Sequence, residues 1–162
     1  MRRSIVRDGV VAGILGATAV AVWFLGVDML YAHALATPEA LGRGVLRLFG
    51  PPGSEGPMVF VIVYTIFHYA AFIAAGLLVS VIVHWAQTAP TVLAGAMMLF
   101  VMFEIGFYGL SSALQESPFL GALGWAQVGT GNLIAAVVIG TYMWRTHPEL
   151  KSELSYALGG QE

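Results

Sequence analysis

The chain has 162 residues, of which 58% are hydrophobic and only 10% are charged, and its mean hydropathy is +0.81. Soluble domains carry roughly a quarter charged residues, so the composition indicates an integral membrane protein, and the length fits a single domain, residues 1–162. The formal net charge is −2 with dispersed basic residues, which excludes a basic stripe and makes nucleic acid an unexpected partner. Because the chain has no cysteine, disulfides, thiolate metal sites and cysteine nucleophiles are excluded.

Four apolar runs are long enough to cross the ~30 Å hydrocarbon core, which takes ~20 helical residues. They cover residues 9–31, 58–86, 90–114 and 120–144. The first run follows a basic leader, as in a signal peptide, but it continues to Leu30 and is longer than a signal core. We therefore expect an all-α bundle of four transmembrane helices, followed by a polar tail, 145–162.

Small residues recur every four positions on one face of the first span and on one face of the fourth. Such faces let helix backbones approach closely in lipid, where packing drives association. We expect the face of the first span to pack inside the bundle, with a homodimer seam as the alternative. On the fourth span the face carries a polar amide, which we expect to find a partner on another helix. The residues are Gly9, Gly13, Ala17 and Ala21 in the first span and Asn132, Ala136 and Gly140 in the fourth.

The connection between the first two spans is long enough to hold a helix of its own. Thr37 is suited to cap it and Pro38 to its first position. Apolar residues then recur on one face of 38–49, and two arginines lie on another. This pattern predicts a short amphipathic helix in the external membrane interface, and a lid over a cavity in the bundle is the alternative.

Basic residues near the span ends predict the orientation, because cytoplasmic loops carry an excess of Lys and Arg. An even number of spans places both termini on one side, and five basic residues then face two on the other. Both termini are therefore expected in the cytoplasm. The five are Arg2, Arg3, Arg7, Arg145 and Lys151, and the two are Arg43 and Arg47.

Two ionisable residues lie inside predicted spans, His68 in the second and Glu104 in the third. Such groups are costly in lipid and mark a functional-site hypothesis. At ~1.5 Å rise per residue the two fall at a similar depth in the outer half of the bilayer, which predicts a His68–Glu104 pair. Other polar side chains fall near this depth, and the predicted polar cluster consists of His68, Glu104, Asn132, Gln127, Tyr64 and Tyr108.

The cluster allows several interpretations. A hydrogen-bonded His68–Glu104 pair can fix the helix register, or serve as a proton relay or a quinone site. One histidine and one glutamate are too few for a metal site of the di-iron bundle type. A bis-histidine haem is excluded because His84 lies on the same helix roughly 24 Å away. A single-histidine haem or pigment ligand at His68 stays open, and no metal, cofactor or catalytic residue is predicted.

A third hypothesis concerns the external interface, where Asp28 and His33 lie at the end of the first span. An enzyme acting on lipid there would need these two residues to meet at a cavity open to that face. We instead expect Asp28 to be solvated or to cap a helix, since no nucleophile is placed there. No nucleotide-binding or hydrolase motif occurs in the sequence.

Short segments of the chain resemble a set of small uncharacterised bacterial membrane proteins with four predicted spans. The resemblance implies a bacterial inner-membrane protein and carries no activity or ligand with it. The segments are WFLGVD, TPEALGRGVL, YTIFHYAAF and GNLIAAVVIGTYMWRTHPEL.

These features together predict a small non-catalytic accessory or structural subunit of a larger membrane complex. Its expected partners are the lipid bilayer and other membrane subunits or further copies of itself. The alternative is a small transport, proton-relay or quinone- or haem-binding module that uses His68 and Glu104.

Overall fold

The computed structural model describes residues 5–31, 33–47, 49–50, 55–86 and 125–147. In this part of the chain every regular element is a helix: α1 (Ile5–Tyr31), α2 (Ala36–Arg47), α3 (Pro57–Ala86) and α6 (Trp125–Thr146). By length and composition, three of them, α1, α3 and α6, are able to cross a membrane. The predicted all-α fold and three of its long apolar helices are confirmed. The predicted span at 90–114 lies outside the described residues, so the count of four stays a prediction.

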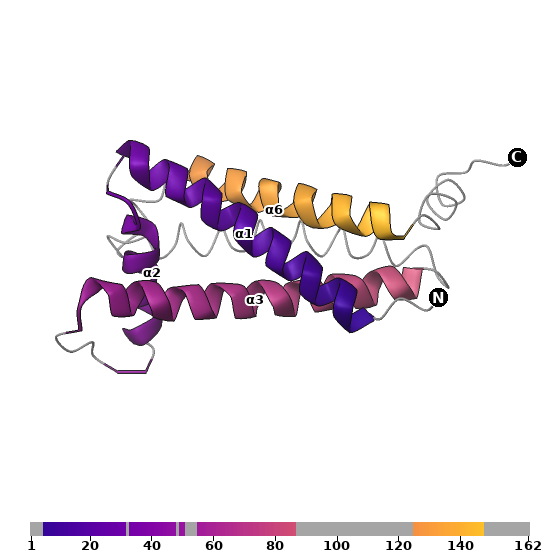
Figure 1. Ribbon diagram of the computed structural model, residues 1–162, viewed down its shortest axis with the longest axis horizontal. Helices are drawn as coiled ribbons and strands as arrows, with labels where there is room; N and C mark the ends of the chain where they lie inside the picture. Colours follow the sequence, from indigo (N-terminus) through magenta and orange to yellow (C-terminus); the bar gives the residue numbers. More distant parts are fainter. Residues whose placement is uncertain (1–4, 32, 48, 51–54, 87–124, 148–162) are drawn as a thin grey trace, which may run out of the picture.

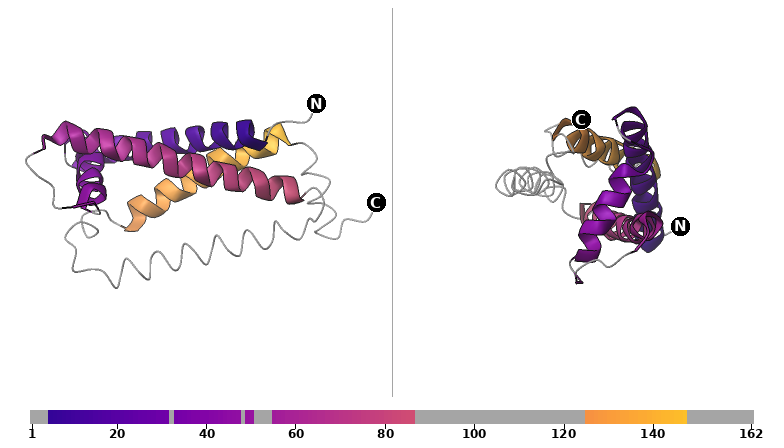
Figure 2. Two further views of the ribbon diagram at one scale, coloured as in Figure 1. Left: turned by 90° about the horizontal axis from the view of Figure 1, so that it is seen from below. Right: turned by 90° about the vertical axis from the view of Figure 1, so that its left-hand side faces the viewer.

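The three long helices lie side by side, with α1 crossing diagonally over α3 and α6 (Figure 1). The start of α1 and the ends of α3 and α6 meet at one end of the bundle, and α2 lies at the other end (Figures 1 and 2). Helix α1 is therefore antiparallel to α3 and α6, which run in the same direction. It follows that the end of α3 and the start of α6 lie at opposite ends of the bundle.

Glycines set the distance between α1 and α3. A Cβ atom at Gly9 would lie 2.6 Å from the Cα of Leu77, and one at Gly13 would lie 2.5 Å from the Cα of Ile73. Gly76 of α3 meets the backbone of the same two α1 glycines. For Gly9 and Gly13, the prediction that the small-residue face packs inside the bundle is confirmed, since backbones approach this closely only where side chains are absent.

Helix α6 packs beside α3 on the same face of α1. The side chain of Ile139 fills the space beside Gly16, where a Cβ would lie 2.8 Å from the Ile139 Cδ1. Near the same end, Ala12, Val83 and Met143 of three different helices form a buried cluster. Large side chains of α6 thus fill the space left by small residues of α1.

The small-residue face predicted for α6 is not the one that packs on α1. Ala136 and Gly140 are exposed, and no atom of the described residues would lie within 4 Å of a Cβ at Gly140. The buried positions of the helix are Gly131, Ala135 and Met143, which lie on the face one residue before the predicted one. The face that packs on α1 carries Ile139 and Met143, whose large side chains gain contacts against small residues of α1.

Helix α2 begins two residues earlier than predicted and lies across the start of α3. Gly42 lies directly against the backbone of Phe60, whose side chain is 2% exposed. The Arg43 guanidinium lies 4.5 Å from the centre of the Phe60 ring and 3.1 Å from a carboxylate oxygen of Glu39. Phe49, expected on the apolar side of this helix, follows its end and is 84% exposed. The helix is positioned by α3, in addition to any contact with the interface.

Candidate functional site

The imidazole of His68 is buried and bonded on both sides. Its Nε2 lies 3.0 Å from the carbonyl oxygen of Ala17, and its Nδ1 lies 3.3 Å from the hydroxyl of Tyr64. A carbonyl oxygen only accepts, so Nε2 carries the proton, and in the neutral ring Nδ1 then accepts from Tyr64. His68 therefore ties α3 to the main chain of α1.

Aromatic rings surround His68 on its own helix. The ring centres of Tyr64, Tyr69 and Phe72 lie 5.3, 5.8 and 4.7 Å from the centre of the imidazole. The Tyr69 ring meets it edge-on. These contacts hold the imidazole in one orientation, toward α1.

A second hydrogen bond joins the same two helices. The Thr18 hydroxyl donates to the carbonyl oxygen of Ile14 at 2.8 Å. It lies 3.0 Å from the hydroxyl of Tyr69, and because the Thr18 proton is already in use, Tyr69 is the donor.

The structure tests only part of the predicted polar cluster. It brings Tyr64 and His68 together, whereas Glu104 and Tyr108 lie outside the described residues. Gln127 lies on α6, where its main-chain carbonyl accepts a hydrogen bond from the Trp23 indole of α1 at 2.9 Å. Asn132 is half-buried on α6. The His68–Glu104 pair stays a prediction.

Asp28, near the end of α1, is buried and caps α2. Its Oδ2 accepts from the main-chain N–H of Thr37 at 2.8 Å, and its Oδ1 accepts from the Thr37 hydroxyl at 2.6 Å. This N–H lies in the first turn of α2, where main-chain donors lack partners in the helix and a negative charge is favoured. Of the two expected roles for Asp28, the structure supports capping. Thr37, predicted to cap this helix itself, donates to Asp28 from inside the first turn.

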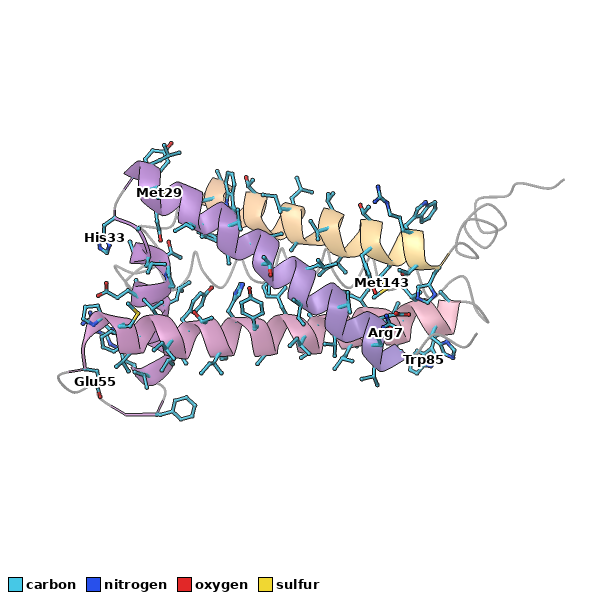
Figure 3. The ribbon with its side chains drawn as sticks, in the orientation of Figure 1. Arg7, Met29, His33, Glu55, Trp85 and Met143 are labelled. Atoms are coloured by element: carbon cyan, nitrogen blue, oxygen red, sulfur yellow. The ribbon has the colours of Figure 1, made fainter. Side chains whose placement is uncertain are left out.

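His33 lies in the connection between α1 and α2 and is exposed (Figure 3). Its Nδ1 is 3.2 Å from the carbonyl oxygen of Ala34. It is not among the described residues that line the cavity beside Asp28. The meeting of Asp28 and His33 that a lipid-directed enzyme would need is therefore not observed.

A cavity of about 280 Å³ lies between α1, α3 and the start of α2. Neither Gln127 nor Asn132 is among its described lining residues. Its walls are mainly apolar, and polar groups interrupt them at several points. The polar residues of the lining are Thr18, Asp28, Thr37, Tyr64, Thr65, His68 and Tyr69.

Sequence reasoning missed a buried contact at the other end of the bundle. The His147 Nε2 lies 3.4 Å from the Asp8 Oδ2, and both side chains are buried. The contact joins the start of α1 to the end of α6 and is an ion pair when His147 is protonated. The available signal was that both residues lie within three positions of predicted spans whose ends are expected on the same side of the membrane.

Within the described residues, no group of three or more His, Asp or Glu side chains could hold a metal ion. The chain matches no protein-family model, no curated protein and no solved structure. Its class therefore follows from its own helices: they form an α-helical bundle whose three long apolar members indicate contact with a lipid bilayer.

Proposed function

We propose that the chain is a small non-catalytic accessory or structural subunit of a larger membrane assembly. One observation carries the proposal. The imidazole of His68 bonds the main chain of α1 through Nε2 and Tyr64 of its own helix through Nδ1, and the carboxylate of Asp28 uses both oxygens to bond α2. In the described part of the chain, the ionisable side chains of His68 and Asp28 thus hold helices together.

The outer surface of the bundle is consistent with this role. Large exposed apolar side chains occur on all three long helices, among them Leu30 of α1, Ile66 of α3 and Leu133 of α6, which are 78%, 67% and 64% exposed. Such surfaces suit lipid tails and the apolar helices of partner subunits equally well. Partners therefore include other membrane proteins or further copies of this chain.

The direction of the helices supports four membrane crossings. Because α3 and α6 run in parallel, the chain between them has to join opposite ends of the bundle. The apolar run at 90–114 is long enough to do so as a fourth span. The basic residues near the span ends support a cytoplasmic location of both termini, and the resemblance of the sequence supports a bacterial inner membrane.

Purification in a mild detergent tests the accessory role. The tagged chain, extracted from its native membrane, should elute in a complex much larger than its own 17.2 kDa, with partner proteins at fixed stoichiometry or with several copies of itself. A monodisperse monomer that co-purifies with no other protein would contradict the proposal.

A small transport, proton-relay or quinone- or haem-binding module is the second candidate. It is favoured by the hydrogen-bonded series Tyr64–His68–Ala17, because the first two of these residues line the cavity. In this role, His68 and Glu104 would exchange protons or contact the bound group.

A further inference from the structure

The polar groups that line the cavity between α1, α3 and the start of α2 can accept hydrogen bonds from a ligand but have no proton free to donate. The hydroxyl groups of the lining illustrate this. Five lining side chains carry a hydroxyl, and each proton goes to a protein atom. The acceptors are main-chain carbonyls, the His68 ring, the Asp28 carboxylate and one neighbouring hydroxyl oxygen. The five residues are Thr18, Thr37, Tyr64, Thr65 and Tyr69.

With their protons engaged, these hydroxyls present only lone pairs to a molecule in the cavity. The imidazole of His68 adds no donor, because its Nε2 proton is held by Ala17. The polar groups of the lining are therefore hydrogen-bond acceptors, and they match a ligand that donates.

Asp28 adds a negative charge to this set. It is buried and lines the cavity, and it contacts no Lys, Arg or His within the described part of the chain. Each of its oxygens accepts one hydrogen bond from Thr37 and keeps capacity for another. Inside a bundle of low dielectric, a ligand cation beside this carboxylate would be held far more strongly than in water.

We propose that the cavity binds a small lipophilic ammonium ion. Its N–H groups donate to the free lone pairs of Asp28, and its apolar body lies along the rings of Tyr64 and Tyr69. Aromatic faces also attract cations. A volume of about 280 Å³ is roughly nine times that of a water molecule in the liquid, which sets the size of the ligand at about nine non-hydrogen atoms.

The two probes are 2-phenylethylamine, which is protonated at pH 7, and 2-phenylethanol, its neutral counterpart of the same size. Equilibrium dialysis with the full chain in mild detergent should show saturable binding of the amine, tighter than that of the alcohol by about tenfold. Asp28→Asn keeps the shape and one acceptor oxygen and should remove this preference. Glu39→Gln removes a carboxylate that is paired with Arg43 outside the cavity, and should leave both affinities unchanged.

Ala21→Leu gives a test that does not depend on the Asp28 variant. Ala21 lines the cavity, so the larger side chain should weaken the binding of both probes. Equal affinity for amine and alcohol, an unchanged preference in Asp28→Asn, or no saturable binding of the amine would each overturn the proposal. Ligand binding is measured on the chain itself, and failure here would leave the accessory role, tested by the mass of the complex, unaffected.

Discussion

The imidazole of His68 joins two helices through a contact between residues 51 positions apart in the sequence. Its donor proton goes to a main-chain carbonyl of α1, and its second nitrogen is occupied by a tyrosine of its own helix. An aromatic cage then fixes the ring. His68 therefore holds α3 against α1.

His68→Ala should therefore destabilise the protein, by about 1–3 kcal/mol, through the lost packing and the lost interhelical bond. Unfolding by SDS in mixed micelles, followed by circular dichroism, measures this change. His84→Ala is the matched control, because His84 is exposed on the same helix, and it should stay within about 0.5 kcal/mol of the wild type.

The same variant separates the two candidate functions. If His68→Ala unfolds no more easily than His84→Ala but abolishes a proton flux or a haem or quinone absorbance signal, the relay or cofactor role is correct and the structural role of His68 is wrong. Glu104→Gln, predicted to be its partner, should then show the same loss.

The sequence marked His68 correctly as a special residue, since a lone histidine in an apolar helix needs partners. It did not reveal that Asp28 bonds Thr37, because that contact depends on the turn before α2. Leu35 in this turn has a φ of 72°, a conformation uncommon for residues other than glycine. A leucine in the sequence does not predict a turn of this kind.

At the scale of helices, glycine decides where the elements cross. Gly13 lies against the backbone of α3, and no flexible side chain is available there to move aside. Gly42 does the same where α2 crosses α3. Sequence spacing predicted the first crossing, because Gly9 and Gly13 form a regular pattern, whereas Gly42 in a short amphipathic helix gave no comparable signal.

Gly13→Ala should destabilise the bundle by about 1–3 kcal/mol, because the new methyl group forces α1 away from α3. Gly26→Ala is the control on the same helix, since a Cβ at Gly26 would meet nothing within 4 Å. The same SDS unfolding assay measures both. Equal stability of the two variants would show that the glycine crossing does not hold the helices together.

Helix α6 packs on α1 through a face next to the predicted small-residue face, and this choice has a physical origin. Periodicity finds a face of small residues, but it does not say whether a neighbour prefers that face or an adjacent one with larger side chains. On α1 the small face is used because the partner helix α3 also carries a glycine there. Where α6 meets α1, the large side chains belong to α6 and the small residues to α1: Ile139 and Met143 enter the space beside small residues of α1.

For the whole molecule, hydropathy was sufficient to predict an all-α membrane bundle, because the apolar runs are long and separated by polar connections. It was insufficient for the pairing of helices, which depends on side-chain volume and on single contacts such as that of Asp8 with His147. The cavity beside Asp28 was also beyond sequence reasoning, since it is formed by three elements together.

The central claim is a bundle that crosses the membrane an even number of times, with the start of α1 and the end of α6 on the cytoplasmic side. The chain has no cysteine, so an introduced cysteine is the only thiol of the purified variant that can carry the label. Exposed positions at the two ends of the bundle are Arg7, Glu55 and Arg145.

In intact cells, a membrane-impermeant maleimide should label Glu55→Cys, and it should label Arg7→Cys and Arg145→Cys only after the membrane is permeabilised. Ala12→Cys, buried between helices, should stay unlabelled in both conditions. Labelling of Arg7→Cys and Arg145→Cys from opposite sides, or of Glu55→Cys from the same side as both, would contradict this arrangement.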